Sequence, residues 1–67
     1  MDKEYIRIYH DYLDAINLLS DSERGRLFVA LLEYGSTGAE QELTGNEKYL
    51  FAIMRTQIDK DREKELE

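Results

Sequence analysis

The sequence contains no cysteine, no proline and no tryptophan, and it has a single histidine. Without cysteine the chain can form neither a disulfide nor a thiolate metal site, and it is compatible with a reducing compartment. No apolar run approaches the length of a membrane span, and the N-terminus lacks the basic and apolar regions of a signal peptide. We therefore expect a cytoplasmic protein.

Basic residues are also few, since nine lysines and arginines stand against fifteen acidic residues and give a net charge of −6. This charge opposes attraction to the phosphate backbone of nucleic acids and to anionic membranes. The 67 residues make one domain, and a chain of this size buries only about 60% of its unfolded surface. Association with a second copy or with a neighbouring domain is the remaining way to enlarge the core.

A helix near the middle of the chain has the clearest signals. Ser20 followed by Glu23 is a capping box, in which each side chain accepts a hydrogen bond from a backbone N–H of the first turn. Gly35 stands where a left-handed residue would end the helix, and Gly38 permits a further turn. The predicted helix spans Asp21 to Tyr34, and its core face has apolar residues at helical spacing: Leu27, Phe28, Leu31 and Leu32.

Val29 lies among the polar residues on the other side of this helix. Single exposed valines are common, so Val29 indicates either an ordinary surface residue or a second contact surface.

The first part of the chain predicts another helix, from Met1 to Leu19. Apolar residues recur there at helical spacing, with further ones at each side: Tyr5, Tyr9, Tyr12, Ile16 and Leu19, flanked by Ile6, Ile8, Leu13 and Ala15. This apolar arc is wide for so small a protein, which fits either a helix between two others or a helix that meets a partner. The short junction at Ser20 predicts an antiparallel or angled pair with the next helix.

A third helix follows the loop of residues 36–43, in which only Leu43 can reach the core. Thr44 followed by Glu47 repeats the capping-box pattern and predicts a helix from Gly45. Its apolar stripe comprises Tyr49, Leu50, Ile53, Met54, Gln57 and Ile58, with Phe51 and Ala52 to the side. The fold class is therefore all-α, a compact three-helix domain with a long third helix and a charged C-terminal extension.

After Ile58 the sequence becomes DKDREKELE, in which opposite and like charges alternate at helical spacing. We expect residues 1–58 to form the three-helix domain and residues 59–67 to form a solvated helical tail or linker. The final Leu66-Glu67 also resembles the junction left by an affinity-tag vector.

Candidate catalytic and metal-binding groups are weak. His10 and Asp14 lie one helical turn apart and offer only two ligands, so a solvated histidine is the better interpretation. The carboxylate pairs Asp59/Asp61 and Glu40/Glu42 fall in a tail and a loop, without a pocket that would shift their pKa values. We expect no enzyme, with no catalytic residue, no metal and no cofactor.

Two polar features admit more than one interpretation. Gln57 lies inside the apolar stripe of the third helix, where it either hydrogen-bonds the loop backbone near Leu43 or makes a specific contact in an interface. Arg24 and Arg26 form the only local basic cluster, which salt bridges to acidic neighbours explain most simply. A helix-turn-helix DNA-binding protein would instead need a basic third helix, and acidic residues outweigh Lys48 and Arg55 there.

Three segments carry a family resemblance: YHDYLDAINLLSDSERGRLF, LLEYGSTGAEQELTG and LFAIMRTQIDKDREK. Together they resemble an uncharacterised domain family found near the N-termini of proteins from phages, prophages and mobile elements of Gram-positive bacteria. Some members of that family carry further regions resembling phage replication or replisome-organiser proteins. The resemblance implies an N-terminal module without an assigned activity, so no catalytic residue carries over.

We therefore expect a protein-interaction or self-association module, most simply a dimer, in a phage or mobile-element protein with a link to DNA replication. The candidate interface residues are Tyr5, Ile8, Tyr12, Val29, Phe51 and Gln57. The alternatives are a DNA-binding regulator and a small acidic inhibitor of a host protein. We expect no small-molecule substrate and no direct binding of nucleic acid.

Overall fold

The computed structural model describes residues 5–66 and contains three α-helices preceded by one 3-10 turn. In chain order the elements are η1 (His10–Tyr12), α1 (Leu13–Asn17), α2 (Asp21–Thr37) and α3 (Glu47–Leu66). No strand occurs in this range, and α3 is the longest helix. The predicted all-α, three-helix class is confirmed. Over the same range, no helix is both long enough and apolar enough to cross a membrane.

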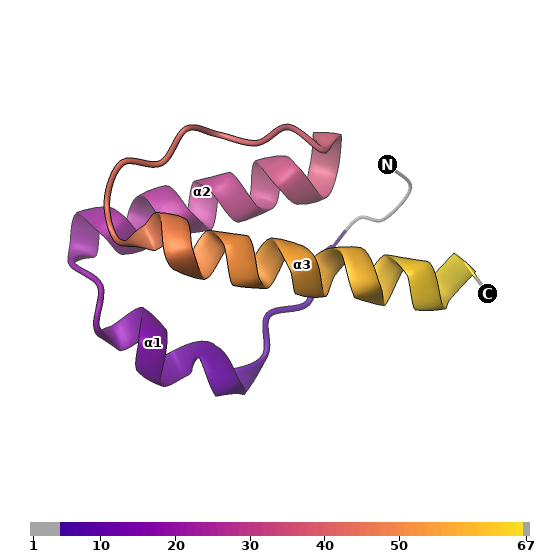
Figure 1. The fold of residues 1–67 in the computed structure, drawn as a ribbon, viewed down its shortest axis with the longest axis horizontal. Coiled ribbons are helices and arrows are strands. Elements are labelled where there is room, and N and C mark those ends of the chain that lie inside the picture. The colour runs from indigo at the N-terminus through magenta and orange to yellow at the C-terminus, as the bar shows by residue number, and fades with distance from the viewer. Residues whose placement is uncertain (1–4, 67) are drawn as a thin grey trace.

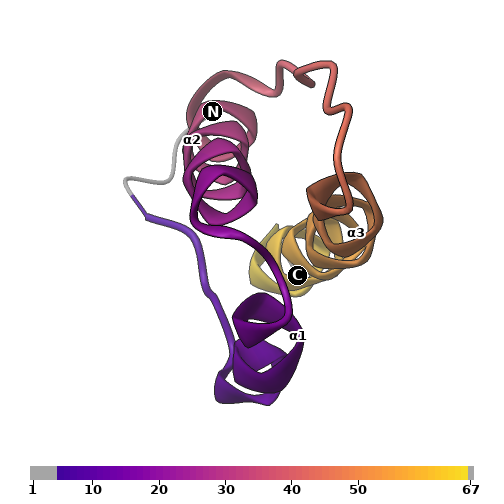
Figure 2. The same ribbon diagram turned by 90° about the vertical axis from the view of Figure 1, so that its left-hand side faces the viewer.

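Helices α2 and α3 lie side by side and run in the same direction, while α1 runs the opposite way beneath them (Figure 1). Because α2 and α3 are parallel, the connection between them must return along the whole length of α2. That length is about 25 Å at 1.5 Å per residue. The nine residues of 38–46 reach about 30 Å when extended, so this segment has just enough length. Figure 2 shows it bridging the two helices on the side away from α1.

This connecting loop is held along its length. Leu43 packs against the core, as the sequence predicted. Gln41 donates a hydrogen bond from Nε2 to Glu33 Oε2 at 2.6 Å, and Arg55 Nη1 pairs with Glu40 Oε1 at 2.5 Å. The loop is therefore attached to both of the helices that it joins.

The core lies where α2, α3 and the end of α1 meet. It consists of apolar side chains from α2, α3 and the turn after α1: Leu19, Leu27, Ala30, Leu31, Leu50, Phe51, Met54 and Ile58. The prediction that Phe28 and Leu32 belong to it is wrong, because both are about half exposed. They lie about 100° around α2 from Leu27 and Leu31, which turns them past the contact with α3.

The predicted first helix is wrong over its first part, because residues 5–9 are not helical and regular structure begins only at His10. Aromatic and β-branched residues, which favour helix weakly, make up most of this segment. In the extended form Ile6 reaches Gly35 of α2 and Tyr9 reaches Asp61 of α3. Residues 1–4, which the prediction also included, lie outside the described range.

Helix α2 continues to Thr37, so the predicted end at Tyr34 is also wrong. The left-handed residue is Gly38, with φ 81° and ψ 0°, and its N–H donates to the Tyr34 carbonyl oxygen. Gly35 instead stays helical and buried, and a Cβ there would overlap Ile6 Cγ2. The absence of a side chain at Gly35 therefore makes room for the extended N-terminal segment.

Replacing Gly38 by alanine is expected to destabilise the domain by about 1–2 kcal/mol, since an L-residue with a Cβ pays that much in the left-handed region. Thermal unfolding followed by circular dichroism measures the loss. Gly38→Asn is the matched control and should lose less, because asparagine tolerates this conformation. Equal melting temperatures for wild type and Gly38→Ala would contradict the assigned helix end.

The charged C-terminal segment is part of the folded body as far as Arg62. Asp59 Oδ1 accepts a hydrogen bond from the Tyr34 hydroxyl at 2.6 Å, and Arg62 donates to the Gly35 carbonyl oxygen. Asp61 is buried against Tyr9. These contacts continue the packing of α3 past Ile58, the last residue of its apolar stripe. Glu67 lies outside the described residues.

Candidate functional site

Because α2 and α3 are parallel, their N-termini lie together, and a polar cluster links them. Glu23 accepts from Ser20 N at 2.8 Å through Oε1 and from Asn46 N at 2.8 Å through Oε2. Glu47, which is 0% exposed, accepts at Oε1 from Arg26 Nε at 2.8 Å and from Gly45 N at 3.1 Å. One carboxylate from each helix therefore accepts a hydrogen bond from a backbone N–H of the two residues directly before α3.

The predicted capping box of α2 is confirmed, since Glu23 N also donates to Ser20 Oγ at 3.2 Å. In α3 Glu47 accepts from the N–H of Gly45 rather than from that of Thr44, so the predicted capping box of Thr44 and Glu47 is wrong. The helix begins at Glu47 itself and not at the predicted Gly45. Asn46, the residue before α3, donates its N–H to Glu23 of α2. The sequence around α3 alone gives no sign of this contact, because Glu23 is far away in the chain.

The electrostatics of this cluster indicate a structural role. The hydrogen bond from Arg26 lowers the pKa of Glu47 below its usual value, and hydrogen bonds from the backbone of Ser20 and Asn46 lower the pKa of Glu23. The bond to Glu47 likewise raises the pKa of Arg26. Both carboxylates are therefore ionised at neutral pH and cannot act as general acids there.

A second polar contact fixes the N-terminal segment to α3. The Tyr9 hydroxyl donates to Asp61 Oδ2 at 2.6 Å, and Gln57 Nε2 donates to Asp61 Oδ1 at 3.2 Å. The bond from Tyr9 lowers the pKa of Asp61, and the same bond raises the pKa of Tyr9. Gln57 therefore bonds Asp61 rather than the loop backbone near Leu43, and Asp61 is not the solvated charge expected from the sequence.

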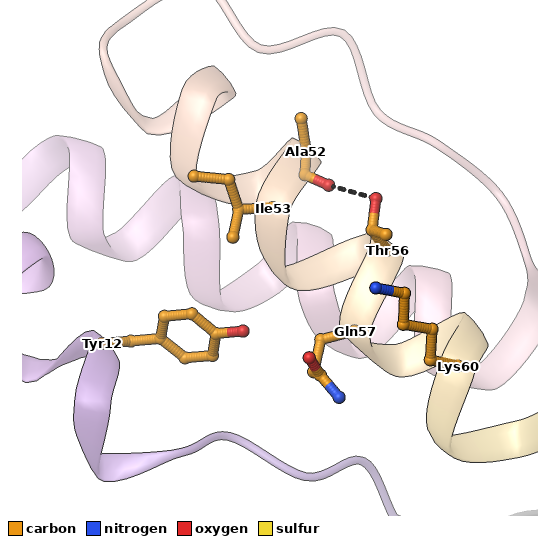
Figure 3. A pocket seen from close by; sticks show the side chains of 6 residues that line it. All are labelled: Tyr12, Ala52, Ile53, Thr56, Gln57 and Lys60. Atoms are coloured by element: carbon orange, nitrogen blue, oxygen red, sulfur yellow. Dashed lines mark hydrogen bonds between the residues drawn. The ribbon is translucent and has the colours of Figure 1, made fainter. Parts of the chain in front are cut away.

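A shallow groove of 370 Å³ lies between η1 and α3, beside a smaller one of 270 Å³. Figure 3 shows the Tyr12 ring directed from the η1–α1 side toward α3. Tyr12 and Gln57, two predicted interface residues, line both grooves. The larger groove is completed by residues of α3: Ala52, Ile53, Thr56 and Lys60.

Two polar side chains of the larger groove form hydrogen bonds with the protein itself. Thr56 Oγ1 donates to the Ala52 carbonyl oxygen at 3.0 Å, and Gln57 bonds Asp61 as described above. A small-molecule site needs several polar groups that converge on the ligand. This groove therefore resembles a surface depression between packed helices more than a binding pocket.

The other residues considered for catalysis or metal binding do not form a cluster among the described residues. His10 is exposed in η1, and within residues 5–66 no three His, Cys, Asp or Glu side chains are placed to hold a metal ion. Glu40 is paired with Arg55. The two predicted salt-bridge residues are confirmed, since Arg24 pairs with Asp21 and Arg26 with Glu47.

The predicted interface residues do not form one surface. Tyr5 and Ile8 are exposed on the extended N-terminal segment, and Val29 is exposed on α2. Phe51 needs correction, because it is buried and its ring meets that of Tyr34 edge-on, with centroids 6.1 Å apart. Phe51 therefore belongs to the core of the single chain.

Sequence reasoning missed several exposed apolar residues. Among the described residues these are Leu13, Leu18, Phe28, Leu32, Tyr49 and Ile53. The signal for two of them is present in the sequence, because Phe28 and Leu32 adjoin Val29 on α2 at helical spacing. They were assigned to the core because one helix carries two adjacent apolar stripes.

The comparisons with known proteins agree with the expectation of an uncharacterised domain, since one family model of unknown function spans nearly the whole chain. No curated protein and no solved structure matches. The matching model, which covers residues 5–66, is that of a family of unknown function (DUF6291), and the chain belongs to this family.

Proposed function

We propose that this domain is a protein-interaction module that self-associates. The observation that carries the proposal is the apolar surface of α2, where Phe28, Val29 and Leu32 are each about half exposed although the core is already filled. Clustered apolar side chains on a small domain are typical of interaction sites. A domain of this size also gains stability by adding a second apolar contact to its small core.

The proposed setting is a phage or mobile-element protein that takes part in DNA replication, with this domain assembling the protein. The resemblance of the three segments quoted above supports that setting. The charge of −6 favours a protein partner over nucleic acid. Three of the arginines are also engaged in ion pairs: Arg24, Arg26 and Arg55.

Absolute mass measured by light scattering over a dilution series tests the proposal. We expect a mass of two chains at high concentration that falls toward one chain on dilution. The mass of one chain over the whole series would exclude self-association. A second experiment titrates the domain with duplex DNA at low salt. If the domain binds DNA and added salt abolishes the binding, the DNA-binding alternative replaces the proposal.

A further inference from the structure

Five exposed residues of α2 form a single seam along its outer side, which we call the outer face: Ser22, Gly25, Val29, Leu32 and Ser36. Their spacing alternates between three and four residues. This is the spacing of the contact positions in pairs of packed helices, because it keeps one seam turned toward the partner helix. The outer face therefore has the pattern of a helix–helix contact that the single chain does not fill.

The sizes of the side chains on the outer face indicate how a second copy would fit. A Cβ at Gly25 would meet nothing within 4 Å, so this position faces open space and carries no side chain to fill it. In an antiparallel pair centred on Val29, Gly25 lies within about 1.5 Å of the level of Leu32 of the second copy, so the missing side chain leaves room for that leucine. A parallel pair would set Gly25 against Gly25 and leave a hole, which costs packing energy.

Charges beside the outer face agree with the antiparallel arrangement. Arg26 and Glu33 lie on the same flank of the seam, seven residues apart. When two copies run in opposite directions about Val29, Arg26 of each lies within about 1.5 Å of the level of Glu33 of the other, close enough for two ion pairs. The Arg26 side chain remains 46% exposed although its Nε bonds Glu47. On the opposite flank, Phe28 of one copy lies near Phe28 of the other.

We infer that the outer face of α2 binds the outer face of a second copy in an antiparallel pair, with Val29 at the two-fold axis. This inference depends on the proposed self-association and adds to it the surface, the orientation and the residues that set both. Each copy carries a net charge of −6, and the contact of Val29 and Leu32 together with the two ion pairs between copies offsets the repulsion between them.

A matched pair of variants tests the surface. Leu32→Glu places an unpaired carboxylate in the seam and is expected to raise the dissociation constant of the dimer by about tenfold or more. Leu13→Glu is the control and should leave the dimer intact. It makes the same change in α1, at a leucine that is 58% exposed, against 49% for Leu32. Both variants should keep the helical circular dichroism of wild type. A dimer that survives Leu32→Glu would overturn the inference and leave self-association standing, whereas a monomeric wild type would overturn both.

Cross-linking tests the orientation, and the chain has no cysteine that would interfere. Val29→Cys is expected to form a disulfide-linked dimer on mild oxidation. Ser22→Cys alone should not, because in the antiparallel pair the two copies of this residue lie about 20 Å apart and a disulfide spans less than about 7 Å between Cα atoms. Mixing Ser22→Cys with Ser36→Cys should restore the cross-link. Efficient linking of Ser22→Cys to itself would instead indicate a parallel pair and overturn the assignment.

Discussion

Phe51→Glu is expected to leave the domain unfolded at room temperature. Phe51 is 6% exposed and packs between α2 and α3, where its ring meets Tyr34. Truncating a buried phenylalanine costs about 3–5 kcal/mol, and a carboxylate in the same position adds the cost of burying a charge. A domain of this length has a total stability of roughly 3–10 kcal/mol, so the substitution removes most or all of it.

Phe28→Glu is the matched control, because it makes the same change in a helix at a side chain that is 58% exposed. We expect this variant to remain folded, with the helical circular dichroism of wild type, when both are measured at high dilution. Cooperative melting of Phe51→Glu near the temperature of wild type would contradict the assigned core. Unfolding of Phe28→Glu under the same conditions would mean that its half-exposed ring contributes to the stability of the single chain.

The helices were predictable where their signals are local. The capping box of Ser20 and Glu23 starts α2 at the expected residue, because both partners lie within one turn of the chain. The end of α2 could not be predicted in the same way, because Gly35 and Gly38 both satisfy the local rule for a terminating glycine. Only the packing of Ile6 against Gly35 explains why the first of them stays inside the helix.

The arrangement of the helices and their polar contacts depends on the tertiary structure. Nothing local in residues 38–46 indicates that they run back along α2 and make it parallel to α3. That arrangement brings Glu23 to Asn46 and Arg26 to Glu47, pairs more than twenty residues apart in the chain. The N-terminal segment is also shaped by a tertiary contact. Its sequence has helical periodicity from Tyr5 onward, but it is extended and Tyr9 hydrogen-bonds Asp61 of α3.

Glu47→Ala is expected to lower the melting temperature at neutral pH by an amount on the order of 10 °C, because a buried charged hydrogen-bond network then loses its acceptor. The change removes the partner of Arg26 and of the Gly45 N–H at the point where α3 begins. Thermal unfolding followed by circular dichroism measures the loss. Glu42→Ala, at an exposed glutamate in the loop, is the control and should melt close to wild type.

The pH dependence separates the charge of Glu47 from its packing. Because the bond to Arg26 lowers the pKa of Glu47 in the folded state below the usual 4.5, its ionised form stabilises the fold above that pH. This contribution is lost as the pH falls through the lowered pKa, when the carboxylate of wild type takes up a proton. The melting temperature of wild type should therefore decrease on acidification more than that of Glu47→Ala, and the two curves should converge. A constant difference between them down to about pH 2 would mean that Glu47 stabilises the junction of α2 and α3 by packing alone, with no contribution from its ion pair.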